Sequence, residues 1–220
     1  GNKYGFVNFI TSNNGFTLAD LFMYNDRHNE ANGEDNLDGN SWNFSNNYGV
    51  EGTTRKHYIN KLRKLKWRNS MAMLFLAQGV PLVWSGDEIG NSQQGNNNAY
   101  CQDNPVGWVN WKNEKTHRRE IRFLEQLAQF RREHPIVANE MPFQFSDYRS
   151  YGSPDLSFHG ESAWILEPSE GRMALGMMYN GAYSTDERYT EDVYVAYNFY
   201  SAASTLALPK LEKDKHWYLV

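Results

Sequence analysis

The hydrophobic pattern of this 220-residue chain changes in kind after His134-Pro135. Before that point, short apolar runs alternate with long segments in which apolar residues recur every three or four positions, which is typical of strands followed by helices. After it, apolar and polar residues alternate between Gly, Pro and Asp turns, which indicates antiparallel strands. We therefore predict an α/β part followed by an all-β part, with the boundary between residues 135 and 150.

The α/β part is predicted to run strand, helix, strand, helix. Two loops rich in Asn and Gly, at 26–52 and 90–107, separate these elements, and loops of this length are usually functional or disordered. The expected elements are a strand at 5–11, a short helix capped by Thr17, a helix at about 54–78 capped by Thr53 or Thr54, a strand at 80–85, and a helix at about 115–133 whose residues Ile121, Leu124, Leu127, Ala128 and Phe130 face inward.

The all-β part is expected to form a small antiparallel domain. Its candidate strands are the segments with period-two hydrophobicity, at 162–167, 172–179, 192–200, 204–208 and 216–220.

Charge and hydropathy exclude several classes of partner. The net charge is -4 with a pI near 5.9, which gives no attraction toward nucleic acid or an anionic membrane. The basic stretch 61–68 is interpreted as a solvated helix face. The apolar run 71–77 is far shorter than the roughly 20 residues of a membrane span. Cys101 stands alone, so no intrachain disulfide forms, which suits a reducing cytoplasm.

Motifs for phosphate, dinucleotide and serine-hydrolase chemistry are missing, and the six histidines lack metal-ligand spacing, so we expect neither a metal nor a cofactor. What remains is a mixture of carboxylates, amides and aromatic rings in the loops. Such a mixture binds sugars, although the same residues also build turns and cores. The candidates are Asp35, Asp38, Asp87, Glu88 and Asp103, interleaved with Trp42, Tyr48, Trp84, Tyr100, Trp108 and Trp111.

A complete pair of catalytic carboxylates is not expected among these residues. Retaining glycoside hydrolysis needs two carboxyl groups about 5–5.5 Å apart. Asp87 and Glu88 are adjacent, and neighbours on a strand point to opposite faces. A pairing of Asp87 with Asp35 or Glu51 across the loops has no motif behind it.

Several collinear runs resemble the isoamylase and glycogen-debranching branch of the α-amylase superfamily, glycoside hydrolase family 13. The run at 95–104, Gly-Asn-Asn-Asn-Ala-Tyr-Cys-Gln-Asp-Asn, is the most specific, and the resemblance extends over about residues 5–135. The other matching runs are 7–18, 29–36, 49–52, 77–81 and 86–88.

The resemblance implies that residues 1–135 are the carboxy-terminal portion of a (β/α)₈ barrel, with its seventh and eighth strands, and that 136–220 form the antiparallel β-sandwich that follows it. Active sites of such barrels gather at the C-terminal ends of the strands. The segments after Thr11 and after Ser85 are therefore expected to lie on the substrate side.

The chain departs from the family where catalysis is concerned. The family's His-Asp positions correspond to Asn13 and Asn14, and its nucleophile and acid/base come from strands that would precede Gly1. Asparagine can bond a hydroxyl but cannot offset a developing cation, and losing one such group costs about 10²–10³ in rate. Trp84 replaces a small aliphatic residue. The substrate contacts that the resemblance implies are Asn13, Asn14, Asp35, Trp84, Asp87, Glu88 and Tyr100.

Three functions follow for a cytoplasmic protein of carbohydrate metabolism. The first is a catalytically inactive piece of a debranching glycosidase that still binds α-glucans such as glycogen, starch or maltooligosaccharides. The second is the carboxy-terminal component of a split glycosidase that a separate amino-terminal chain completes. The third is a homo-oligomer that associates through strand edges and helix faces that an incomplete barrel leaves uncovered.

Overall fold

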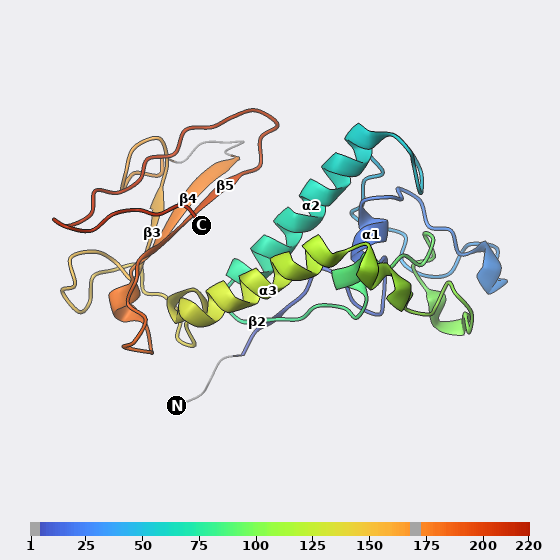
Figure 1. The fold of residues 1–220 in the computed structure, drawn as a ribbon, viewed down its shortest axis with the longest axis horizontal. Helices are drawn as coiled ribbons and strands as arrows, with labels where there is room; N and C mark the ends of the chain where they lie inside the picture. The colour runs from blue at the N-terminus through green and yellow to red at the C-terminus, as the bar shows by residue number, and fades with distance from the viewer. Residues whose placement is uncertain (1–4, 168–172) are drawn as a thin grey trace. The chain divides into compact units, whose positions relative to one another are not determined.

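The computed structural model describes residues 5–167 and 173–220. They fall into two compact units, which we call the α/β unit (residues 5–132) and the β unit (the described residues from 133 to 220). Figure 1 labels their helices and strands. The predicted change from an α/β to a β architecture is therefore observed, while the assignment of the two parts to a barrel and a sandwich stays a prediction.

The α/β unit contains two short strands that pair in parallel, β1 (Val7–Asn8) and β2 (Val80–Pro81). Val7 lies opposite Val80, and the backbone N–H of Val80 donates to the Phe6 carbonyl at 2.6 Å. Both strands occur where the sequence predicts them, but each is shorter than expected. Strands in parallel sheets are normally paired on both sides and covered on both faces, and here each strand has one partner among the described residues.

A short helix, α1 (Leu18–Leu21), follows the first strand, and its predicted cap is confirmed. The Thr17 side chain accepts a hydrogen bond from the Asp20 backbone N–H at 3.2 Å. This bond satisfies one of the donors that the first turn of a helix leaves free. Leu18 is fully buried and brings the helix into the core of the unit.

The long helix α2 (His57–Leu76) begins later than predicted, and the predicted cap by Thr53 or Thr54 is wrong. Lys56 occupies the N-cap position without a side-chain hydrogen bond, and the Thr54 hydroxyl accepts from the Lys56 N–H at 3.2 Å. Thr54 therefore stabilises the turn before the helix. In the described part of the chain, no helix is both long and apolar enough to cross a membrane.

The core of the α/β unit lies along one stripe of α2. Its buried residues recur at intervals of three or four, which places them on one helix face. Leu18 of α1 packs against this stripe, as do the partly buried Phe123, Leu124 and Leu127 of α3 (Arg118–Glu133). Of the five inward residues predicted for α3, Leu124 and Leu127 belong to this core cluster. The buried residues of α2 are Ile59, Arg63, Trp67, Met71 and Leu74.

The interpretation of the basic stretch 61–68 as a solvated face is wrong for one of its members. Arg63 is 6% exposed and lies on the same stripe as Trp67 and Met71, whereas Lys61 and Lys64 are exposed. A guanidinium tolerates such burial only where its donors are satisfied.

The β unit contains an antiparallel sheet in the order β3 (Leu156–His159), β4 (Ala174–Tyr179) and β5 (Val193–Asn198). The strands predicted at 172–179 and 192–200 are confirmed by β4 and β5. Residue 172 lies outside the described residues.

The other three predicted strands of the β unit are wrong, and β3 was missed. Ser162 and Ile165 make an isolated bridge, and the 204–208 segment is tied to Gly160 by a bond from the Ala207 N–H at 2.9 Å. Residues 216–220 have no assigned strand. Alternation alone cannot supply the neighbouring strand that a ladder needs, so the sandwich stays a prediction.

Candidate functional site

The segments that follow β1 and β2 are joined by the buried carboxylate of Asp87. One Asp87 oxygen accepts from the Thr11 hydroxyl, and the other accepts from the backbone N–H of Leu18 at 2.8 Å. Burial raises the pKa of Asp87 to about 6, against the lowering effect of these two bonds. Asp87 is 1% exposed, so the expected sugar contact at this residue does not stand. Its carboxylate instead fixes the two segments to each other.

A second buried carboxylate, Asp20, ties α1 to the loop after β2. It accepts hydrogen bonds from the Ser92 hydroxyl at 2.5 Å and from the N–H groups of Gln93 and Gly95 at 2.8 and 3.4 Å. Burial raises the pKa of Asp20 to about 6, although the three bonds favour its ionised form. The loop at 90–107 is thereby held against α1.

Two fully buried asparagines, Asn29 and Asn97, connect the 26–52 and 90–107 loops. The Asn29 Nδ2 donates to Asn97 Oδ1 at 2.8 Å, and the Asn97 N–H donates to Asn29 Oδ1 at 3.0 Å. The Asn97 carbonyl accepts from the Gly15 N–H at 3.0 Å. One amide pair therefore holds both long loops next to the turn at 12–15 that carries Asn13 and Asn14.

More amides extend this network outward. Asp38 accepts from the Nδ2 groups of Asn32 and Asn98 at 2.7 and 2.8 Å, and these bonds lower its pKa. Asn96 and Asn32 exchange a further amide bond at 2.8 Å. Apart from the Asp38 carboxylate, the groups in this outer part of the network are neutral amides.

The loop at 47–52 is held by Arg63 from one side and by its own Glu51 from the other. The Arg63 guanidinium donates to the carbonyls of Gly52, Asn47 and Val50 at 2.7, 2.8 and 2.5 Å. The Glu51 carboxylate accepts from the N–H groups of 25 and 26, from Asn47 Nδ2 at 2.6 Å and from the His28 ring at 3.1 Å. The side chain of Glu51 thus joins the 47–52 loop to residues 25 and 26.

The carboxylates considered as catalytic partners have other contacts or other surroundings in the structure. Both oxygens of Asp87 and of Glu51 accept hydrogen bonds from other groups, so each carboxylate holds neighbouring segments in place. Asp35 is exposed in a left-handed backbone conformation, with a φ of 51°. Glu88 accepts from the Gly86 N–H at 2.8 Å within its own turn. The described residues hold no group of three or more acidic, histidine or cysteine side chains placed to bind a metal.

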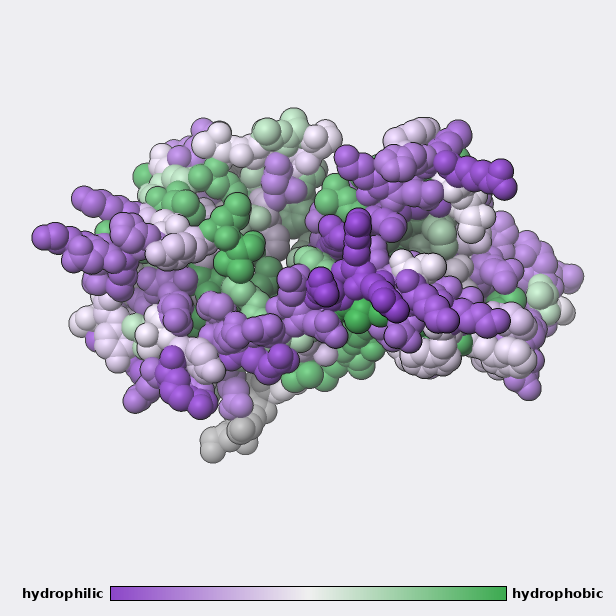
Figure 2. Space-filling view, in the orientation of Figure 1, coloured by the Kyte–Doolittle hydropathy of each residue, from purple (hydrophilic) through white to green (hydrophobic). Residues whose placement is uncertain are grey.

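The remaining predicted contacts lie at the surface of the α/β unit. Asn13 and Asn14 are exposed, and Trp84 is partly buried. Tyr100 is 74% exposed and donates from its hydroxyl to Glu34 at 3.1 Å. These groups offer amide bonds and aromatic faces, which are the means of holding a neutral polyol. Figure 2 shows the loops of this unit as largely hydrophilic on the face drawn.

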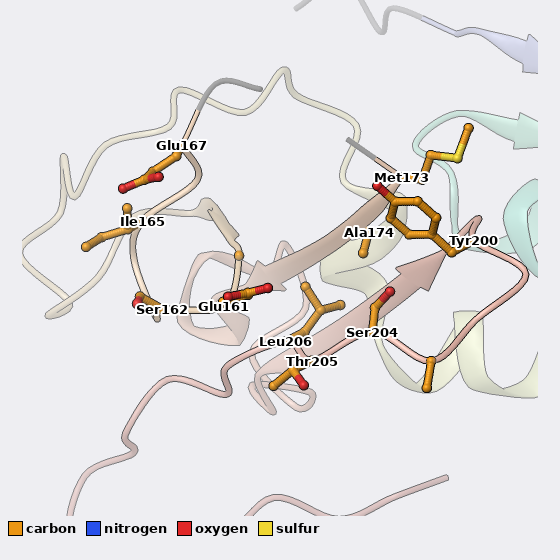
Figure 3. A pocket seen from close by; sticks show the side chains of 12 residues that line it. Glu161, Ser162, Ile165, Glu167, Met173, Ala174, Tyr200, Ser204, Thr205 and Leu206 are labelled. Atoms are coloured by element: carbon orange, nitrogen blue, oxygen red, sulfur yellow. The ribbon is translucent and has the colours of Figure 1, made fainter. Parts of the chain in front are cut away.

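The β unit has a concave surface of its own. A cavity of about 670 Å³ lies between the 160–167 segment and the 203–206 segment, beside the start of β4. Figure 3 shows Glu161, Ser204 and Tyr200 among the side chains around it. None of the residues that the sequence predicts for substrate binding lines this cavity.

Sequence reasoning missed the residues that hold the site together, which are Asn29, Asn97, Asp20 and Arg63. A signal exists for Asn97, because it is the middle one of three successive asparagines at 96–98, and asparagine side chains readily bond backbone groups in loops. Arg63 carries a signal as well, since it occupies the apolar stripe of α2 in sequence. The charge of the surrounding stretch obscured it.

Comparison with known proteins relates this chain to debranching enzymes. The glycogen debranching enzyme of Pectobacterium atrosepticum is 44% identical over 144 residues, which cover 66% of this chain and 22% of that protein. A glycogen operon protein GlgX homolog of Mycobacterium tuberculosis is also 44% identical over 144 residues, with 66% and 20% covered. Isoamylase 1, chloroplastic, of Arabidopsis thaliana is 37% identical over 205 residues, which cover 92% of this chain and 24% of that protein. No family model matches.

The chain thus spans about a fifth to a quarter of the length of the curated relatives that it matches. Solved structures show the same fold. The pullulanase from Bacillus acidopullulyticus superposes with a TM-score of 0.60 at 18% identity, over 93% of this chain and 19% of that one. The pullulanase from Paenibacillus barengoltzii, solved with maltohexaose and α-cyclodextrin, gives a TM-score of 0.53 at 18% identity, over 87% and 22%.

Proposed function

We propose that this chain, which is related in sequence to a segment of the enzymes in the isoamylase and glycogen-debranching branch of the α-amylase superfamily, contributes α-glucan contacts to a debranching enzyme and does not cleave glycosidic bonds by itself. It corresponds to the last part of a (β/α)₈ barrel and the β domain after it. Glycogen, starch chains and maltooligosaccharides are the ligand class, and the setting is cytoplasmic carbohydrate metabolism.

The arrangement of β1, α2 and β2 supports the barrel assignment. The two strands run parallel and α2 lies between them in sequence, which is the repeating unit of such barrels. The turn at 12–15 and the segment at 84–88 follow the two strands, which end at Asn8 and Pro81. In barrels of this kind, segments at these ends contact substrate.

The neutral side chains of the exposed turn at 12–15 support inactivity. A glycosidase has to balance an oxocarbenium-like transition state and to protonate a leaving group. The exposed turn presents the amides of Asn13 and Asn14, while the nearby carboxylates of Asp20 and Asp87 are buried and bonded internally. Amides bind hydroxyls but supply neither charge nor a proton.

One observation carries the proposal: a buried amide and carboxylate network holds the loops that match debranching enzymes, and it leaves Asn13, Asn14 and Tyr100 exposed beside it. A network of this kind fixes the exposed groups before a ligand arrives, which reduces the entropy lost on binding.

Isothermal titration with maltoheptaose tests the binding. We expect a measurable heat at millimolar ligand and a weaker one for the Asn13→Ala/Asn14→Ala variant, in which both exposed amides are removed. An absence of heat with the wild-type chain at millimolar maltoheptaose would remove the binding proposal. Release of linear chains from amylopectin by the purified chain at ordinary turnover, with contaminating amylases excluded, would remove the proposed inactivity.

A second function is assembly with another polypeptide. It is favoured by the exposed apolar residues in and next to β1 and β2, which we call the strand region. Phe6, Val7, Phe9 and Val80 are each more than half exposed, and parallel strands normally bury both faces. We expect either self-association or binding of another chain that supplies further barrel strands and two catalytic acids. Light scattering that shows a monomer at high concentration would contradict self-association, and restored debranching with such a chain would identify a split enzyme.

A further inference from the structure

Two aromatic side chains in the 26–52 loop are almost fully exposed. Trp42 is 77% exposed and Phe44 is 96% exposed. One residue separates them in sequence, so two large apolar rings are exposed within one short segment. The residues next to them in sequence are Asn40, Ser41 and Asn43, so the rings project from a polar and uncharged stretch of chain.

The backbone that carries these rings is fixed by a buried group. The Nδ2 of Asn97 donates to the Asn40 carbonyl at 2.8 Å and to Asn43 Oδ1 at 2.7 Å, and it thereby holds the chain on both sides of Trp42. The Trp42 N–H donates to Asn40 Oδ1 at 3.1 Å. A ring on an anchored backbone loses less entropy when it binds than a ring on a mobile loop.

Phe44 is held in a conformation that its side chain disfavours. Its φ is +52°, in the left-handed region that residues other than glycine rarely occupy. Such conformations persist where the surroundings impose them, and they are concentrated at binding and active sites. The chain on either side is anchored, at Asn43 by Asn97 and at Asn46, whose N–H donates to the Leu21 carbonyl at 2.9 Å.

We propose that Trp42 and Phe44 form an aromatic platform on which a neutral α-glucan stacks, outside the contacts at Asn13, Asn14 and Tyr100. The inference rests on the proposed function and adds a binding surface to it. The apolar face of a sugar ring stacks on an aromatic ring, and the flanking amides can bond its hydroxyls. The two residues are two positions apart, so their Cα atoms lie within about 7 Å of each other.

The surroundings favour a glucan over a protein at this surface. The exposed residues of the strand region are mostly aliphatic or phenylalanine, as a partner strand requires, whereas the platform consists of two rings among amides. The neighbouring cation, Arg27, is directed to the Asn36 carbonyl at 2.8 Å and to Ser41 Oγ at 3.3 Å. Residues 39–47, which carry the two rings, include no acidic or basic side chain, and this suits an uncharged polymer.

The platform also lies beside the turn that carries Asn13 and Asn14. Asn97 accepts from the Gly15 N–H through its carbonyl and holds residues 40 and 43 through its side chain. Two segments bonded to one residue are close neighbours. A maltooligosaccharide of several units therefore has both surfaces within reach.

Isothermal titration with maltoheptaose on the full chain tests the platform with Trp42→Ala, Phe44→Ala and the double variant. We expect the double variant to bind about tenfold more weakly, which corresponds to about 1.4 kcal/mol. Both rings are exposed, so thermal unfolding should be unchanged, and this is checked by circular dichroism. Tyr218→Ala is the matched control, because Tyr218 is 81% exposed and belongs to the β unit, and it should leave the affinity unchanged.

The outcomes separate this inference from the function on which it rests. Unchanged maltoheptaose affinity in the double variant, together with lost affinity in Asn13→Ala/Asn14→Ala, overturns the platform and leaves the proposed function standing. An absence of binding by the wild-type chain overturns both. Unchanged sugar affinity together with loss of self-association in sedimentation makes this surface a protein interface and also overturns the platform.

Discussion

Removal of the Arg63 guanidinium is the sharpest test of how the loops are held. The side chain reaches from α2 to three carbonyl groups in the 47–52 loop, those of Gly52, Asn47 and Val50, at 2.5 to 2.8 Å. Arg63→Ala leaves these carbonyls without their donor and opens a void on the buried stripe of the helix. The loop then depends on Glu51 and on the Asn25 side chain, whose oxygen accepts from the Asn47 N–H at 2.8 Å.

The expected loss follows from these three bonds. Hydrogen bonds to a charged partner contribute about 1.5–3 kcal/mol each, which gives about 4.5–9 kcal/mol for the three. Desolvation of a buried guanidinium offsets several kcal/mol of that, and the Arg63 Nε is buried without a hydrogen-bond partner among the described residues. We therefore expect the free energy of unfolding to fall by about 3 kcal/mol in Arg63→Ala. Arg63→Lys, which keeps the charge but not the planar fork, should lose about half as much.

Urea unfolding followed by tryptophan fluorescence measures this loss. With a slope of about 2 kcal/mol per molar, the midpoint should fall by about 1.5 M. Lys61→Ala is the control, because Lys61 is exposed on the same helix and should change stability by less than about 0.5 kcal/mol. If Arg63→Ala unfolded within 0.5 kcal/mol of the wild type, the guanidinium would not anchor the loop, and our account of the site would be wrong.

Two further predictions concern the buried polar network. Burial raises the pKa of Asp20 from 3.8 to about 6, so the folded state binds the proton more tightly than the unfolded state does. The contribution of Asp20 to the free energy of unfolding is therefore greatest below pH 4. It falls by about 3 kcal/mol as the pH rises to about 6. Asp20→Asn should flatten this slope in urea titrations at pH 4 to 7, and an unchanged slope would contradict the assignment. Gly39→Ala should cost about 1–3 kcal/mol more than Gly33→Ala in thermal unfolding, because both glycines have positive φ, near 75° and 78°, but only at Gly39 would the new Cβ lie 2.2 Å from Asn97 Oδ1. Equal costs would show that the loop yields freely at Asn97.

Sequence patterns predicted the elements whose cause is local. Thr17 caps α1 through a bond to a residue three positions away, and the stripe of α2 follows from intervals of three and four. The strands of the α/β unit were placed correctly but their lengths were not, because the length of a ladder depends on how far a neighbouring strand runs beside it. The same dependence explains why 204–208 and 216–220 alternate in sequence without forming strands.

The site was predicted in outline and missed in its connections. The loops at 26–52 and 90–107 were predicted from their length to be functional or disordered, and their role in binding stays a prediction. The bonds that join them link residues 54 or more positions apart, such as Asn43 with Asn97 and Asn29 with Asn97, and no spacing rule encodes such a pair. Asp87 is an example. Its position after a strand indicated a contact with substrate at the surface, but its carboxylate is buried and bonds Thr11 and Leu18.

The network explains how two very short strands can support a defined surface. Val7–Asn8 and Val80–Pro81 contribute too few ladder bonds to fix the segments that follow them. Asp87 bonds to both Thr11 and Leu18, and Asn97 bonds to Gly15 and to the chain around Trp42, so the relative positions of these segments are set by directional polar bonds. A buried polar group that loses its partner costs more than a truncated apolar contact of the same size, and this penalty disfavours other arrangements of the loops. A substitution in this network should therefore alter sugar affinity even where it leaves every exposed contact residue in place.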